Sequence, residues 1–289
     1  MPADKGRRKA LLSPMVSYAE NGEDVILRRV FSGPKGFYLD VGAAFPTVAS
    51  ITKHFYDQGW HGINIEPHKG MCAMLKKARS RDINLDCAIG SRPGRAVMSH
   101  FSDSFGLSTL DAQVTKQHVA AGRTVSTTSV TVRTLDDMLQ HYAKRKHIDF
   151  MKIDVEGGEE DVLRSCNLAQ WDPTVLVVES TVPTSQKPSY RDWEGIVLRA
   201  GYRCALFDGL NRYYAKKNDK RMLQLLSLPP NPFDEYVPFK WWAMVAPELR
   251  EQYLQRNLAR GRDMRAFSLF EKQWPSIRKE FHVAWGYDV

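Results

Sequence analysis

"GFYLDVGAAFPTVAS" occupies residues 36–50 and decides the fold. It begins as an apolar strand, carries Asp40 near the strand end and breaks at a single glycine, Gly42. The polar residues that follow lead through Pro46 into a helix expected over about residues 47–59. A dinucleotide-binding turn would need the glycines of G-x-G-x-x-G, which let the backbone approach a pyrophosphate. This turn lacks them, and Asp40 would repel a phosphate.

Strand and helix patterns alternate along the chain, which is typical of a parallel sheet with helices on both faces. Parallel strands are expected at residues 36–43, 62–67, 83–90, 148–157 and 174–180. Strands at 202–209 and 212–217 are expected to add a C-terminal antiparallel hairpin. The sequence therefore predicts an α/β fold with a Rossmann-like, doubly wound and mostly parallel sheet.

The two ends of the chain depart from this alternation. We expect a basic N-terminal segment at residues 1–16, the α/β domain at 17–237 and a Trp-rich helical C-terminal tail at 238–289. The tail is expected to contain two short helices. Large aromatic residues are normally well buried, so the tail is expected to pack on the α/β domain or on a second copy of the chain as a homo-oligomer.

Composition limits the classes of function. The 289-residue chain has a net charge of +8, but its basic residues are scattered and not interleaved with aromatic residues. The charge therefore indicates a solvated basic surface and no nucleic-acid partner. No apolar run approaches the ~20 residues that span a bilayer, and no secretory signal or C-x-x-C pair is found. A cytoplasmic protein is expected.

Acidic residues stand at the ends of all the predicted parallel strands. They are Asp40, Glu66, Asp86, Asp154 with Glu156, and Glu179. Acids often cap the following helix, but capping does not require one at every strand. Ligands of open parallel sheets bind beyond the carboxyl ends of the strands. These residues are therefore expected to surround one crevice for a ligand with a positive charge and a ribose but no phosphate.

S-adenosylmethionine fits this description, because it carries an ammonium and a sulfonium group. Asp40 is expected to attract the ammonium group, and Gly42 to let the backbone approach the cofactor. Glu66 is placed to bind the ribose hydroxyls, as an acid does in the dinucleotide fold. The adenine is expected to border Asp86 and the backbone near Cys87 and Ala88.

Motifs along most of the chain resemble the FkbM family of S-adenosylmethionine-dependent methyltransferases. They are SYAENGED (17–24), GFYLDVGAAFP (36–46), GWHGINIEP (59–67), FGLSTL (105–110), IDFMKIDVEGGEEDVL (148–163) and FDGLNRYY (207–214). They follow the order of the family and cover about residues 17–237. The resemblance implies O-methylation of a hydroxyl group on a sugar, a polyketide or another natural product.

The resemblance implies the same cofactor roles for the strand ends and adds Ala43 to the cofactor loop. It also implies that the segment ENGED, residues 20–24, folds over the cofactor with Asn21 or Glu23 near its methionine end. The same segment can serve as the N-cap of the helix that follows, and both roles are compatible. At Ala19 the family more often has glutamine, so no cofactor contact is expected there.

Methyl transfer requires an acceptor oxygen aligned with the methyl group, and a general base assists by removing the hydroxyl proton. Asp154 is the first candidate for the base, because the fourth strand end faces the methyl group in this fold, and Glu156 is the second. Alternatively, Asp154 braces the turn after its strand. Asp154 and Glu179 are also candidate ligands for Mg²⁺, which needs few carboxylates.

Acceptor contacts are expected from segments above the crevice. FGLSTL is a glycine-containing polar loop suited to a lid, and FDGLNR supplies carboxamide and guanidinium groups that can bind sugar hydroxyls. For Asn211 the alternative is a role in the turn. The candidate substrate-binding residues are Ser108, Thr109, Glu179, Asp208, Asn211 and Arg212.

Other functions remain open at this stage. An N-methyltransferase acting on an amino sugar or peptide has the same requirements. A non-catalytic interaction module that keeps the fold is a second alternative, although the full set of strand-end acids argues against lost activity. A nucleic-acid methyltransferase would need an Asn/Asp-Pro-Pro-aromatic motif to hold a flipped base. O-methylation of a small molecule is the predicted function.

Overall fold

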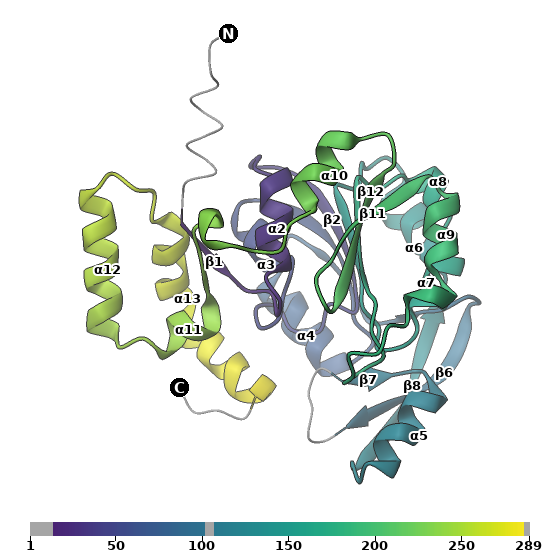
Figure 1. Ribbon diagram of the computed structural model, residues 1–289. Coiled ribbons are helices and arrows are strands. Elements are labelled where there is room, and N and C mark those ends of the chain that lie inside the picture. Colours follow the sequence, from purple (N-terminus) through teal and green to yellow (C-terminus); the bar gives the residue numbers. More distant parts are fainter. Residues whose placement is uncertain (1–13, 102–106, 286–289) are drawn as a thin grey trace.

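The computed structural model describes residues 14–101 and 107–285 (Figure 1). Residues 1–13 of the basic N-terminal segment and the first two residues of FGLSTL lie outside these ranges. Within these ranges, no helix combines the length and hydrophobicity needed to cross a bilayer.

The central sheet is mixed and has the strand order β11-β12-β10-β9-β2-β3-β4. Its parallel strands are β2 (Phe37–Val41), β3 (His61–Ile65), β4 (Ile83–Leu85), β9 (Phe150–Ile153) and β10 (Val175–Glu179). β12 (Asn211–Lys216) pairs antiparallel with both β10 and β11 (Tyr202–Phe207). From β2 the chain first builds the sheet toward β4 and later returns to β9 on the other side, so the strand order reverses beside β2.

Helices cover both faces of this sheet, because side chains in each strand alternate between the faces. Leu39, Met151 and Leu176 pack on one face. That face is covered by α6 (Leu135–Tyr142), α7 (Glu159–Arg164), α8 (Leu168–Trp171) and α9 (Glu194–Arg199). Tyr38 and Phe150 pack on the other face. There the covering helices are α2 (Glu23–Val30), α3 (Lys53–Asp57) and α10 (Lys220–Leu226). The α/β class predicted from the sequence is confirmed.

A second sheet has the order β5-β8-β6-β7. It consists of β5 (Ala88–Ile89), β6 (Gly94–Phe101), β7 (Ser108–Thr109) and β8 (Val125–Arg133), and α5 (Ala112–Ala120) lies between β7 and β8. The single strand predicted at 83–90 is wrong, since its first part is β4 of the central sheet and its last part is β5. Asp86 and Cys87 carry the chain from one sheet to the other.

The helix predicted at 47–59 is also wrong in its first half. Only α3 is an α-helix there, and the preceding residues form a loop in which Ala44 and Ala49 have positive φ values of 49° and 54°. Such values place L-residues in the left-handed region, which is incompatible with continuing a right-handed helix. Two charged side chains hold this loop, as described below.

The segments that precede and follow the α/β part of the chain pair in a separate two-stranded sheet. β1 (Met15–Ser17) pairs in parallel with β13 (Tyr236–Pro238). The tail continues with α11 (Phe239–Met244), α12 (Pro247–Ala259) and α13 (Arg265–Trp285), the last much longer than predicted. Remaining elements are α4 (Lys69–Ala78) and the 3₁₀ turns Tyr190–Asp192 and Pro232–Asp234. Phe239, Phe267 and Phe270 of the tail form one apolar core with Phe45 and Val48, so the tail packs on the α/β part of its own chain.

Candidate functional site

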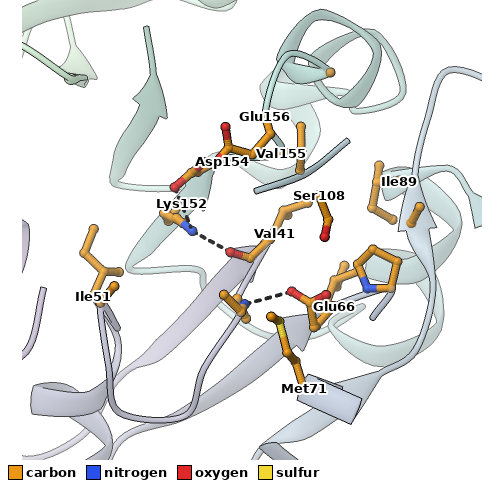
Figure 2. Close-up of a pocket in the computed structure, with 18 of the residues that line it drawn as sticks. Val41, Ile51, Glu66, Met71, Ile89, Ser108, Lys152, Asp154, Val155 and Glu156 are labelled. Carbon is orange, nitrogen blue, oxygen red and sulfur yellow. Dashed lines mark hydrogen bonds and ion pairs between the residues drawn. The ribbon is translucent and has the colours of Figure 1, made fainter. Parts of the chain in front are cut away.

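A cavity opens at the carboxyl ends of β2, β3 and β9, where the strand order reverses (Figure 2). It encloses about 1160 Å³ of non-atom space, part of it open to solvent. Small-ligand pockets commonly lie at such a switch point. The candidate residues that line it are Glu23, Gly42, Ala43, Glu66, Cys87, Ala88, Ser108, Asp154, Glu156 and Asn211.

The turn after β2 depends on Gly42. Its φ is +81°, and the amides of Gly42 and Ala43 donate to the carbonyl of Ile65 at 2.9 and 3.1 Å. A Cβ atom at position 42 would lie 1.8 Å from the carbonyl oxygen of Asp154. The close approach that requires glycine is therefore with the backbone after β9, and it joins two strand ends that line the cavity.

Glu66 lies on the cavity wall with both carboxylate oxygens hydrogen-bonded. Oε2 accepts the amide of Ala44 at 2.8 Å, and Oε1 accepts the amide of His68 at 2.7 Å. Burial raises the pKa of Glu66 to about 7. Each carboxylate oxygen can accept a further hydrogen bond, so Glu66 is able to bind ligand hydroxyl groups.

Lys152 is a cavity residue that the sequence analysis missed. Its Nζ donates to the carbonyl of Gly42 at 2.6 Å and lies 3.4 Å from Asp40 and 3.3 Å from Asp154. Burial alone would lower its pKa, but the carboxylates of Asp154 and Asp40 outweigh burial and raise the pKa above its ordinary value. The signal was a lysine within the apolar strand β9, which needs a buried partner.

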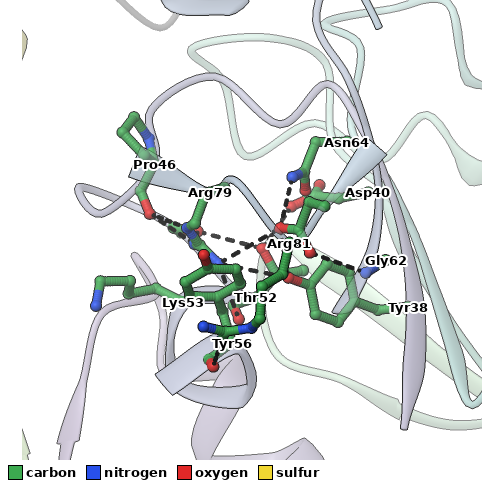
Figure 3. A network of polar contacts seen from close by, with 12 residues as sticks. Tyr38, Asp40, Pro46, Thr52, Lys53, Tyr56, Gly62, Asn64, Arg79 and Arg81 are labelled. Carbon is green, nitrogen blue, oxygen red and sulfur yellow. Dashed lines mark hydrogen bonds and ion pairs between the residues drawn. The ribbon is translucent and has the colours of Figure 1, made fainter. Parts of the chain in front are cut away.

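Asp40 lies beneath the cavity rather than on its wall. The residue is 2% exposed, and its Oδ2 accepts a hydrogen bond from Thr52 Oγ1 at 3.2 Å. Figure 3 shows it within a polar network that also contains Tyr38 and Arg79. Burial raises the pKa of Asp40. Asp40 does not line the cavity itself but forms an ion pair with Lys152, which does.

Carboxylates gather on the side of the cavity that follows β9. Glu156, which has a positive φ of 58°, lies beside Asp154 on the wall (Figure 2). Burial and then the charge of Asp154 raise the pKa values of Glu156 and Glu179. Glu179 is buried behind the wall, and its Oε2 has no hydrogen-bond partner among the described residues. In the described part of the chain, no group of three or more His, Cys, Asp or Glu side chains is arranged to hold a metal ion.

ENGED and FDGLNR meet at the cavity although they are far apart in sequence. Asn211 Nδ2 donates to Glu23 Oε1 at 2.8 Å, and the backbone amide of Asn21 donates to Glu23 Oε2 at 2.8 Å. Glu23 and Asn211 line the cavity, whereas Asn21 faces the carbonyl of Asp208 at 3.4 Å. Burial raises the pKa of Glu23 to about 8.

Glu23 predicts a pH dependence of stability. Its pKa rises from an ordinary 4.5 to about 8 on folding, so the folded protein keeps a proton that the unfolded chain releases. The free-energy cost of burying this carboxyl group is absent below about pH 4.5, where both states are protonated, and reaches its full value above about pH 8. Relative to Glu23→Gln, the wild-type free energy of unfolding is therefore expected to fall by a few kcal/mol (on the order of 3) between about pH 5 and pH 9. Chemical denaturation across this range measures the difference, and a constant difference would contradict the prediction.

The other candidate residues lie off the cavity wall. Asp86 has a side chain 57% exposed and lies 3.9 Å from Lys76. Thr109 Oγ1 donates to the carbonyl of Glu156 at 2.7 Å and so supports that turn. Asp208 accepts the amides of Leu210 and Asn211 in the β11–β12 turn. Arg212 is 2.7 Å from Glu194 and stacks on Tyr190.

The apolar residues that line the cavity belong to no motif from which the sequence analysis could predict them. They are Ala49, Ile51, Pro67, Met71, Ile89, Met98 and Leu110. They come from the loop after β2, from α4 and the turn before it, and from the second sheet and the turn after β7. Glu20 of ENGED also lines the cavity and was not predicted. The cavity wall thus combines apolar and acidic residues, with Glu66 across the cavity from Asp154 and Glu156 (Figure 2).

Known proteins match part of the chain. Residues 40–204 match the family model described as the methyltransferase FkbM domain. Among solved structures, the chain is similar to methyltransferase FkbM from Methylobacillus flagellatus KT, with 15% sequence identity and a TM-score of 0.41. That alignment covers 66% of this chain and 47% of the other, so this chain spans about half the length of that protein. No curated protein matches the sequence.

Proposed function

We propose, from the premise that this chain belongs to the FkbM methyltransferase family, that it transfers a methyl group from S-adenosylmethionine to a hydroxyl group of a small molecule such as a sugar or secondary metabolite. In this proposal the seven-stranded sheet is the Rossmann-like, doubly wound sheet of such enzymes, and β11 and β12 form its closing hairpin. The observation that carries the proposal is the cavity at the reversal of strand order, whose wall combines apolar and acidic residues.

The described residues fit this cofactor. Met71, Ala88 and Ile89 offer an apolar surface for the adenine, and Glu66 offers carboxylate oxygens for the ribose hydroxyls. Glu20 supplies negative charge for the ammonium and sulfonium groups. The pKa of Glu23 is about 8, and a bound cation favours its ionised form, so Glu23 adds a second negative charge when the cofactor binds. When bound, S-adenosylmethionine supplies an activated methyl group.

Asp154 and Glu156 are the proposed bases for the acceptor proton. Asp154 is about one-third exposed at its side chain, and Lys152 fixes its position through the ion pair at 3.3 Å. Burial and the charge of Asp154 raise the pKa of Glu156, which makes Glu156 a strong base when it is ionised. Comparing kcat of Asp154→Asn with that of Glu156→Gln assigns the role to the residue whose change lowers it by about 10²-fold or more.

Calorimetric titration of S-adenosylmethionine into the wild-type protein tests the proposal directly. Binding in the micromolar range, followed by turnover on a panel of glycosides and polyketides, is the expected result. Absence of binding to the folded wild-type protein would contradict the proposed function.

Glu66→Gln is expected to weaken S-adenosylmethionine binding by about 10- to 100-fold, because hydrogen bonds to a charged group contribute about 1.5–3 kcal/mol. The side-chain amide introduced by this change would also face the backbone amide of Ala44 or His68, both of which now donate to Glu66. Glu194→Gln is the control, since Glu194 pairs with Arg212 away from the cavity. Calorimetry measures both dissociation constants, and equal values for the two variants would argue against a ribose contact.

Transfer to an amine is a second candidate function, favoured by the charge of the cavity. Glu20, Glu23, Asp154 and Glu156 line the cavity, whereas Lys152 is the one basic residue on the wall that the described residues form. An ammonium group would be attracted there, and nearby carboxylates can accept its proton. Matched alcohol and amine acceptors distinguish the two functions by their relative kcat/KM.

A further inference from the structure

The loop between β2 and α3, residues 43–52, forms part of the cavity wall through Ala44, Ala49 and Ile51. Ala44 and Ala49 have positive φ values, and a side chain makes this left-handed backbone conformation unfavourable for an L-residue. The loop therefore needs contacts from outside itself to keep its conformation.

One set of contacts comes from Arg79, beneath the loop. Its Nε and Nη2 donate to the carbonyl of Pro46 at 2.8 and 2.6 Å, and Nη2 also donates to Ser50 Oγ at 2.9 Å. Arg79 is 1% exposed and stands at the centre of the network in Figure 3. These bonds hold the loop at two positions, Pro46 and Ser50, from within the α/β part of the chain.

The opposing contacts come from α13, in the C-terminal tail. Glu280 Oε1 accepts the amides of Thr47 and Val48 at 2.7 and 2.5 Å, and the residue is 6% exposed. Both bonds are charge-assisted when the carboxylate is ionised, and bonds of this kind are about twice as strong as neutral ones.

Three further residues of α13 face the same region. Gln273 Oε1 accepts a hydrogen bond from Lys53 Nζ at 2.7 Å, just after the loop. Phe270 and Ile277 share an apolar core with Phe45 and Val48. Positions 270, 273, 277 and 280 have the i, i+3, i+7, i+10 spacing of one helix face. One face of α13 therefore packs against the loop that forms this part of the cavity wall.

We propose that Glu280 is a positioning residue for the methyl donor. It holds residues 43–52 in the conformation that forms the cavity wall, so the tail, which lies outside the matched residues 40–204, completes the cofactor site. The inference rests on the proposed function, because it assumes that this cavity binds S-adenosylmethionine.

Calorimetry with S-adenosylmethionine tests the inference on the full chain. Glu280→Ala removes both bonds and is expected to raise the dissociation constant about 20-fold. Glu280→Gln keeps an uncharged carbonyl acceptor and is expected to raise the dissociation constant only about three- to fivefold, with a correspondingly smaller increase in loop exchange. Glu271→Ala is the matched control on the same helix, since Glu271 accepts a hydrogen bond from Trp242 Nε1 at 2.8 Å away from the loop. It is expected to leave the dissociation constant unchanged even if it lowers the unfolding temperature.

Hydrogen exchange of the amides of residues 43–52, measured without cofactor, separates the two proposals. Glu280→Ala is expected to speed exchange there about tenfold or more, and Glu271→Ala is not. Cofactor binding by Glu280→Ala within twofold of wild type would overturn the positioning role. Failure of the wild-type protein to bind S-adenosylmethionine would instead overturn the proposed function. If Glu280→Ala does not fold, Glu280→Gln decides: faster loop exchange and weaker binding support the role, and wild-type values of both overturn it.

Discussion

Gly42→Ala is expected to abolish measurable cofactor binding and to lower the free energy of unfolding by about 4 kcal/mol. The left-handed backbone contributes about 1–2 kcal/mol of strain for an L-residue, and overpacking contributes about 1–3 kcal/mol. The second effect is large because the new Cβ would meet the Asp154 carbonyl at 1.8 Å, and backbone cannot move aside as a side chain can. The new contact would push the ends of β2 and β9 apart and displace the residues after them that line the cavity.

Gly122→Ala is the matched control for this prediction. Gly122 has a φ of +85°, close to that of Gly42, but a Cβ atom there would meet nothing within 4 Å. It should therefore show the backbone strain alone. Chemical denaturation and calorimetry of both variants make the comparison, and equal destabilisation by the two would refute the role assigned to the contact with Asp154.

Lys152→Met is expected to lower the free energy of unfolding by about 3–5 kcal/mol at pH 7, because it leaves a buried carboxylate without its partner. Asp40 is 2% exposed and loses its ion pair. Protonation of Asp40 relieves this cost, since burial already raises its pKa. The difference from wild type is therefore expected to shrink as the pH is lowered. Chemical denaturation at several pH values measures it.

A surface lysine supplies the control for Lys152. Lys216 forms an ion pair with Asp172 at 2.5 Å, but the two side chains are 34% and 62% exposed. Lys216→Met should cost less than about 1 kcal/mol, as exposed pairs do. The double variant Lys152→Met, Asp40→Asn should recover part of the lost stability. If Lys152→Met lowers the free energy of unfolding no more than Lys216→Met does, burial of the Lys152–Asp40 pair contributes little to stability.

Local signals explain what could be predicted from the sequence. Each predicted parallel strand is an apolar run bounded by polar or glycine residues, and a strand forms at each of these positions. The run at 83–90 is the exception, because two sheets share it. Its residues Ile83 and Ile89 are equally apolar, and only the distant partner β8 reveals that Ile89 belongs to another sheet.

Side-chain alternation carried information about Asp40 that the sequence analysis did not use. Tyr38 faces α2 and α3, whereas Leu39 and Val41 face the opposite side of the sheet. Asp40 follows Tyr38 by two residues, so the period of a strand places its carboxylate on the same face as Tyr38 rather than at the strand end. The same argument places Lys152 with Phe150, and the two charged residues meet.

The loop at 43–52 could not be predicted in this way. Its amides at Thr47 and Val48 bond to a residue 233 and 232 positions later in the chain. Nothing within the loop indicates that partner, and its composition is equally compatible with the helix that was expected. Long-range contacts of this kind override local propensity.

Because α13 packs on this loop, the loop cannot take its final conformation until α13 has been synthesised. Domains generally begin to fold from the N-terminus as the chain emerges, and β2 and β3 are made early. The contact between Thr47 and Glu280 closes only after most of the chain has been translated. We therefore expect a nascent chain that has already formed its central sheet to remain unable to capture the methyl donor. Competence would arrive only after residue 280 has left the ribosome and α13 has packed on the loop.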